Sequence, residues 1–258
     1  MKLLVDIGNT RLKSALLDQG ALIEPRSLVW RGESLRESLE ELWRGFVPSA
    51  VAIASVAPDA MVNSVSQYSQ STWNKTPDIA RVQKECFGLH CGYLQPESLG
   101  VDRWLAMLGA WGRQQTSWLV ADLGTAATLD VIDSSGRHLG GCIFAGIETQ
   151  RRALSRSTAA LPQVDRETHE LLARETREGV ALGTLLSVVG GVRELYSNAR
   201  DWPQCEGLQL CLTGGASPVV ARRLGLDHEV FPSLVLEGLA MSVFAEKIST
   251  PQTVANAK

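Results

Sequence analysis

The stretch Val5-Asp6-Ile7-Gly8-Asn9-Thr10-Arg11 decides the fold of this chain. The apolar residues just before it, Leu3-Leu4-Val5, predict a buried strand that delivers Asp6 into a tight turn. Gly8 has no side chain, so the backbone there can approach a ligand closely. The amide, hydroxyl and guanidinium that follow suit phosphate oxygens, and a divalent cation could link Asp6 to a phosphate. Taken alone, however, an ordinary hairpin turn explains the stretch better.

The same pattern returns in Trp118-Leu119-Val120-Ala121-Asp122-Leu123-Gly124-Thr125-Ala126. The offset from Asp6 to Asp122 is 116 residues. At this offset the coinciding positions are Asp6 with Asp122, Gly8 with Gly124, Gly20 with Gly136 and Leu16 with Ile132. Self-similarity at so long a period indicates the duplication of a whole domain. We therefore expect an α/β protein with two domains, residues 1–114 and 115–258.

Hydrophobic periodicity predicts the other elements. Further strands are expected at 12–17, 21–30, 51–54, 137–144 and 208–212. Helices are expected at 33–46, 61–68, 101–113, 176–199 and 234–247, with one from Gly146 and another ending near Arg223. Residues 81–100 should be irregular, 158–167 a polar loop, and 249–258 a frayed tail. We also expect Cys142 to be a small core residue and Arg151-Arg152 to lie on a solvated helix face.

Composition narrows the class of protein. The 258 residues carry a formal net charge of -3, so no basic excess favours nucleic acid or a membrane surface. No apolar run reaches the roughly 20 residues that cross a bilayer, and Asp6 interrupts the apolar start before a signal peptide could form. The five cysteines and four histidines show no metal-binding spacing, so any metal should be held by oxygen. We expect a cytoplasmic protein.

Two more segments carry chemistry, although neither a P-loop nor a Gly-x-Gly-x-x-Gly fingerprint is present. Thr213-Gly214-Gly215-Ala216 follows a strand and opens a helix, where backbone N–H groups could bind a nucleotide. Gly100-Val101-Asp102-Arg103 places an acid in the first turn of a predicted helix. Asp102 could simply compensate the helix dipole, or it could be a catalytic base beside an anion-binding arginine.

Together these four segments resemble those of the type III pantothenate kinases. That family belongs to the superfamily of actin-like ATPases and sugar kinases, whose members pair two ribonuclease-H-like domains around ATP. The resemblance runs from Leu3 to about Phe244. It implies a duplicated ribonuclease-H-like fold, each domain a mixed five-stranded sheet with flanking helices. It also implies phosphorylation of pantothenate by ATP at the start of coenzyme A synthesis, by a homodimer.

The resemblance implies roles for individual residues. The first phosphate loop would bind ATP, together with Thr125, through Asp6, Ile7, Gly8, Asn9, Thr10, Arg11, Leu12 and Lys13. Asp6 would coordinate Mg²⁺, and Asp122 would bind a monovalent cation, K⁺ or NH₄⁺. Asp102 would be the general base. Pantothenate would be held by Tyr93, Gly100, Val101, Asp102 and Arg103, and by Thr176 from across the dimer interface.

One position departs from the family pattern. The family often has Pro-Gly where this chain has Ala145-Gly146, so we expect a local change in the loop without loss of activity. Two other functions stay open from the residues: another small-molecule kinase or a phosphatase of the same superfamily, and a regulatory protein that binds nucleotide to control a partner.

Overall fold

A computed structural model describes residues 1–30, 35–158, 161–165, 167–168 and 170–248. The predicted tail 249–258 and the first two residues of the predicted helix 33–46 therefore lie outside the described residues. The chain divides into two compact units. Unit 1 comprises Met1–Gln115 and the described residues from Ser233 onward, and unit 2 comprises Thr116–Pro232.

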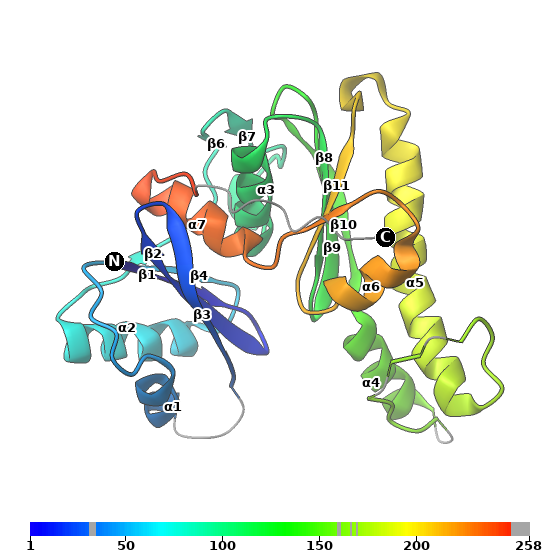
Figure 1. The fold of residues 1–258 in the computed structure, drawn as a ribbon, viewed down its shortest axis with the longest axis horizontal. Coiled ribbons are helices and arrows are strands. Elements are labelled where there is room, and N and C mark those ends of the chain that lie inside the picture. Colours follow the sequence, from blue (N-terminus) through cyan, green and yellow to red (C-terminus); the bar gives the residue numbers. More distant parts are fainter. Residues whose placement is uncertain (31–34, 159–160, 166, 169, 249–258) are drawn as a thin grey trace. The chain divides into compact units, whose positions relative to one another are not determined.

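Unit 1 is built on a five-stranded sheet in the order β3-β2-β1-β4-β5 (Figure 1). Its strands are β1 (Lys2–Ile7), β2 (Arg11–Asp18), β3 (Ala21–Val29), β4 (Val51–Ser55) and β5 (Asp78–Ile79). β1 pairs antiparallel with β2 and parallel with β4, so the sheet is mixed. The helices α1 (Leu35–Leu42) and α2 (Asp59–Trp73) share a core with Leu3, Val5 and Ile7, which alternate along one face of β1.

Two helices of unit 1 lie far apart in the sequence. α3 (Val101–Arg113) follows a short hairpin, β6 (Glu85–Cys86) and β7 (Leu89–His90), and a 3-10 turn at Pro96–Ser98. α7 (Leu234–Phe244) packs directly on α3. A Cβ on Gly238 would lie 1.9 Å from the Leu105 carbonyl oxygen, so only glycine permits this contact.

The position of α7 corrects the expected division at 1–114 and 115–258. The last helix belongs with the first domain, because glycines on both helices bring their backbones together and because Arg113 binds Glu237. Arg113 Nε and Nη2 donate to the two carboxylate oxygens of Glu237 at 2.7 and 2.8 Å, and both side chains are largely buried. The first domain is therefore formed by two separate stretches of the chain.

Unit 2 repeats the architecture of unit 1. Its sheet has the order β10-β9-β8-β11-β12. The strands are β8 (Trp118–Leu123), β9 (Ala126–Ile132), β10 (His138–Ala145), β11 (Gln209–Thr213) and β12 (Glu229–Val230). Its helices are α4 (Ile147–Ser157), α5 (Thr176–Arg200) and α6 (Ser217–Leu224), with a 3-10 turn at Pro203–Cys205. β8 again pairs antiparallel with the next strand and parallel with a later one, so the predicted duplication is confirmed.

The two copies differ by one residue at the turn after the first strand. The pairing of Ile7 with Leu12 corresponds to that of Leu123 with Ala127. The offset is thus 116 from Ile7 to Leu123 but 115 from Leu12 to Ala127, because the second turn is one residue shorter. Consequently Leu16 matches Val131, and not Ile132 as the single offset suggested.

Two expectations for unit 2 were wrong. Cys142 is exposed, because β10 is an edge strand and leaves one side of the residue uncovered. Arg151 is buried, and its guanidinium donates to Thr184 Oγ1 at 3.3 Å and to Glu148 at 2.7 Å. Among the described residues, no helix has the length and apolar character to cross a membrane.

Candidate active site

The first turn is held by backbone and side-chain hydrogen bonds. The Gly8 N–H donates to the Arg11 carbonyl at 3.0 Å, and the Gly8 carbonyl accepts from Trp30 Nε1 at 3.1 Å. The Val56 N–H donates to the Ile7 carbonyl at 3.2 Å, which ties the turn to the neighbouring strand end. The turn is therefore fixed while Asn9 and Arg11 stay exposed. Trp30 was not among the predicted site residues, since no motif marks it.

Asp6 lies on the sheet face opposite to α1 and α2. Side chains alternate along a strand, so Asp6 shares a face with Leu4 and not with Leu3, Val5 and Ile7. Leu4 is fully buried but is not part of the core beneath α1 and α2. α7 packs on β1 and β4 from this other side, and α3 lies beside α7 (Figure 1). Asp6 and the helix that carries Asp102 are therefore on the same face of one sheet.

Asp102 lies in the first turn of α3, as the sequence predicted. Its Oδ1 accepts the Arg103 N–H at 2.8 Å. A Cβ on Gly100 would lie 2.6 Å from the same oxygen, so glycine leaves room for the carboxylate. The half-buried Asp102 side chain is thus held against its own helix terminus, where the helix dipole favours an anion.

Arg103 is buried and bound to Tyr93. Its side chain is only 4% exposed, and Nη1 donates to the Tyr93 hydroxyl at 2.8 Å. The guanidinium carbon also lies 5.5 Å from the centre of the Tyr93 ring, within the range of a cation–π contact. Tyr93 and Arg103 come from separate segments of the chain and were both predicted to bind pantothenate. The structure brings them into contact.

The second turn is enclosed by two glycines. A Cβ on Gly214 would lie 2.5 Å from Asp122 Oδ1, and a Cβ on Gly146 would lie 2.1 Å from the Gly124 carbonyl oxygen. Gly214 also has φ +86°, a conformation that favours glycine. The second Asp-x-Gly turn and the predicted nucleotide-binding glycine pair therefore form one packed site within unit 2.

The Thr125 carbonyl is a further anchor of the second turn. It accepts the Gly146 N–H at 3.1 Å and the Thr149 hydroxyl at 2.6 Å. Thr149 was not among the predicted site residues, because a threonine in the first turn of a helix does not by itself indicate a binding site. Thr176, by contrast, is the first residue of α5 and is exposed.

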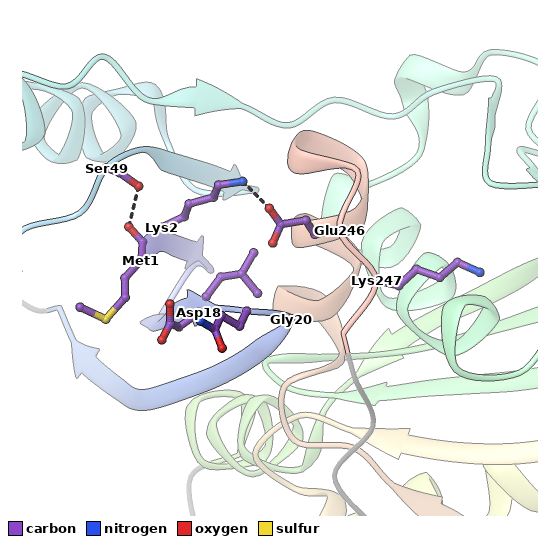
Figure 2. A pocket seen from close by; sticks show the side chains of 9 residues that line it. Met1, Lys2, Asp18, Gly20, Ser49, Glu246 and Lys247 are labelled. Carbon is purple, nitrogen blue, oxygen red and sulfur yellow. Dashed lines mark hydrogen bonds and ion pairs between the residues drawn. The ribbon is translucent and has the colours of Figure 1, made fainter.

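A surface hollow elsewhere in unit 1 does not coincide with these turns (Figure 2). Its volume is about 530 Å³, and it is lined by residues at the start of β1, at the β2–β3 turn and after α7, including Met1, Asp18 and Lys247. Lys2 and Glu246 form an ion pair at its wall. Because Gly8 lies at the other end of β1, none of the predicted site residues lines this hollow.

Comparison with known proteins gives the family. A sequence profile of type III pantothenate kinases matches residues 2–198. A type III pantothenate kinase from Halorhodospira halophila is 35% identical over 245 residues, which cover 93% of this chain and 96% of that protein.

Two solved structures show the same fold at low identity. A Campylobacter jejuni protein assigned to the Baf family of transcriptional activators has a TM-score of 0.58 at 22% identity, covering 94% of this chain and 98% of that one. A Sinorhizobium meliloti protein assigned as a 2-dehydro-3-deoxygalactonokinase has a TM-score of 0.57 at 12% identity, covering 95% and 99%. The likeness to a sugar kinase and the two repeated mixed sheets confirm the duplicated ribonuclease-H-like fold. By its sequence over most of its length, the chain belongs to the type III pantothenate kinase family.

Proposed function

We propose that this protein transfers the γ-phosphoryl group of ATP to the primary hydroxyl of pantothenate, forming 4′-phosphopantothenate. The observation that carries the proposal is the Gly100–Arg103 segment, whose buried arginine and helix-start acid lie on the same sheet face as the Asp6 turn. In a member of this family, that arrangement supports an acceptor site next to a phosphate site. The product would enter coenzyme A biosynthesis.

The residues act through positioning and charge. Asp102 accepts the hydroxyl proton as the hydroxyl oxygen bonds to the γ-phosphorus and the bond to the β–γ bridging oxygen breaks, releasing ADP. Arg103, with Tyr93, Gly100 and Val101, holds pantothenate. Residues 6–13 and Thr125 contact the ATP phosphates. Phosphoryl transfer requires mainly such positioning and neutralisation of charge.

The donor atoms fit hard cations. Among the described residues, no three His, Cys, Asp or Glu side chains gather in a way that could hold a metal. Mg²⁺ is commonly bound by one or two carboxylates together with substrate phosphates, so the single carboxylate of Asp6 suits it. A monovalent cation, K⁺ or NH₄⁺, would be held at Asp122, whose carboxylate lies among backbone groups of its turn and Gly214. Both cations would neutralise phosphate charge.

The proposal includes a homodimer in the cytoplasm. Thr176 is exposed at the start of α5, which is compatible with its contacting pantothenate bound to a second copy of the chain. In solution, sedimentation equilibrium should give twice the mass of 28.0 kDa.

The test of the function is a coupled assay of ADP release with ATP, Mg²⁺, K⁺ and pantothenate, on the wild type and on Asp102→Asn. Asparagine keeps an oxygen that can accept the Arg103 N–H, so the fold should persist. Loss of the general base should lower kcat by about 10²- to 10⁴-fold. Asp59→Asn is the matched control, because Asp59 is also a first-turn acid in unit 1 and is not in the site.

Near-native turnover by Asp102→Asn would show that another group accepts the proton. A wild type that binds ATP but phosphorylates neither pantothenate nor related alcohols would favour the regulatory function. Turnover with a different alcohol alone would favour another kinase of the superfamily.

A further inference from the structure

We propose that Arg222 and Arg223 position the segment that leads into Thr176, and so set the affinity for the acceptor substrate. This acceptor segment comprises the described residues 161–165, 167–168 and 170–175. The inference rests on the proposed function, in which Thr176 contacts pantothenate. It assigns a positioning role to two residues that lie outside the predicted site.

The two arginines end α6 and bind the acceptor segment at two points. Arg222 forms an ion pair with Glu167, and Arg223 Nη2 donates to the Glu170 carbonyl at 2.6 Å. One contact is to a side chain and the other to the backbone. The two arginines therefore hold the segment through the side chain of Glu167 and through the backbone of Glu170.

The acceptor segment is also fastened to the start of α5. Val164 is 3% exposed and packs with Val180 and Ala181, while Arg177 donates to the Gln163 carbonyl at 3.4 Å. Val180 is one helical turn beyond Thr176, on the same helix start. Movement of the segment would therefore be passed to the residue that contacts pantothenate.

α6 is a fixed support for the arginines. Arg193 of α5 donates from Nε to the Leu224 carbonyl at 2.6 Å and from Nη2 to the Arg223 carbonyl at 2.8 Å. The other end of α6 follows Gly214, which packs against Asp122. One eight-residue helix thus joins the proposed nucleotide turn to the segment before the acceptor contact.

The exposure of the Arg222–Glu167 ion pair limits how much its loss should change the KM for pantothenate. The side chains of Arg222 and Glu167 are 49% and 54% exposed, so their attraction alone is modest. Charge reversal replaces that attraction with repulsion from Glu167. We expect Arg222→Glu to raise the KM for pantothenate by roughly three- to tenfold, with the KM for ATP and kcat changed by less than about twofold.

Steady-state kinetics of single and paired charge reversals test the inference. Restoring the pair with opposite signs, in Arg222→Glu combined with Glu167→Arg, should return the KM for pantothenate to near its original value. Arg223→Ala should also raise that KM. The control is Arg200→Glu, since Arg200 is a similarly exposed arginine that pairs with Asp201 and does not touch the acceptor segment.

An unchanged KM for pantothenate in Arg222→Glu, or no recovery in the double variant, would overturn the inference. Equal changes in both KM values together with a lower Tm would show a merely structural role and would overturn it too.

If the wild type fails to phosphorylate pantothenate, the proposed function is wrong. Positioning is then tested by hydrogen exchange in the double variant Arg222→Glu/Arg223→Ala. Amides of residues 170–175 should exchange faster than in the wild type, and unchanged exchange would refute the positioning itself.

Discussion

Replacing Gly146 by alanine should move the second turn. Gly146 has φ -66° and ψ 167°, which any residue adopts, so the added methyl group acts through contact and not through backbone strain. Its Cβ would lie 2.1 Å from the Gly124 oxygen and 2.9 Å from the Thr125 oxygen. Both are backbone atoms and cannot rotate away. Relief requires a shift of roughly 1 Å, which would break the bonds to the Thr125 carbonyl described above.

Two measurable losses follow from that shift. Overpacking of this kind costs about 1–3 kcal/mol of unfolding free energy, measurable by urea denaturation. A misplacement of about 1 Å in a catalytic site can cost about a hundredfold in rate, so kcat/KM for pantothenate should fall by that order in the coupled assay.

The matched control for this prediction is Gly190→Ala. Gly190 lies within α5, and nothing lies within 4 Å of an added Cβ. That substitution should leave activity intact and raise stability by up to about 1 kcal/mol, since alanine is the better helix former. If Gly146→Ala matched Gly190→Ala in both activity and stability, the argument that this glycine sets the turn would be refuted.

Arg103→Lys should raise the KM for pantothenate about tenfold while the KM for ATP holds, because lysine lacks the planar group that binds Tyr93; equal changes in both constants would contradict this. Glu237→Ala should lower the unfolding free energy by about 1.5–3 kcal/mol in urea, since it removes the carboxylate that accepts two hydrogen bonds from the largely buried Arg113 guanidinium, and a loss below about 0.5 kcal/mol would contradict this. Replacing K⁺ by Na⁺, which has the same charge but is smaller, should lower turnover at least about tenfold if the site at Asp122 selects its cation by size, and equal activity in Na⁺ alone would show that the site does not require K⁺ or NH₄⁺.

The sequence predicted those parts of the fold that depend on local chemistry. The two turns were recognisable because an apolar strand, an acid and a glycine follow one another directly, and the helix at Asp102 because its glycine and apolar spacing are local signals. The duplicated sheets followed from these. The turn between Leu123 and Ala127 is one residue shorter than its counterpart, and this could not be seen in the sequence, because an offset between two segments assumes equal turn lengths. Only the strand pairing reveals it.

Long-range packing set the limits of prediction. The apolar sequence of α7 indicated burial but not which element would cover it, so α7 was assigned to the wrong domain. Arg151 was expected in solvent because arginines on a helix are usually solvated, yet Thr184 of α5 accepts a hydrogen bond from it. Exposure of Cys142 depends on β10 being the last strand of its sheet, which is a property of the topology.

The return of α7 to unit 1 has a consequence for the order of folding during synthesis. Unit 2 is one continuous stretch, so every part of its core is available once Pro232 has emerged from the ribosome. In unit 1, the surface of α3 around Gly109 stays uncovered until α7, which packs on it, has been synthesised. At usual elongation rates, the time between the synthesis of Gln115 and that of α7 is on the order of ten seconds. The first stretch of unit 1 therefore stays incomplete during the whole synthesis of unit 2.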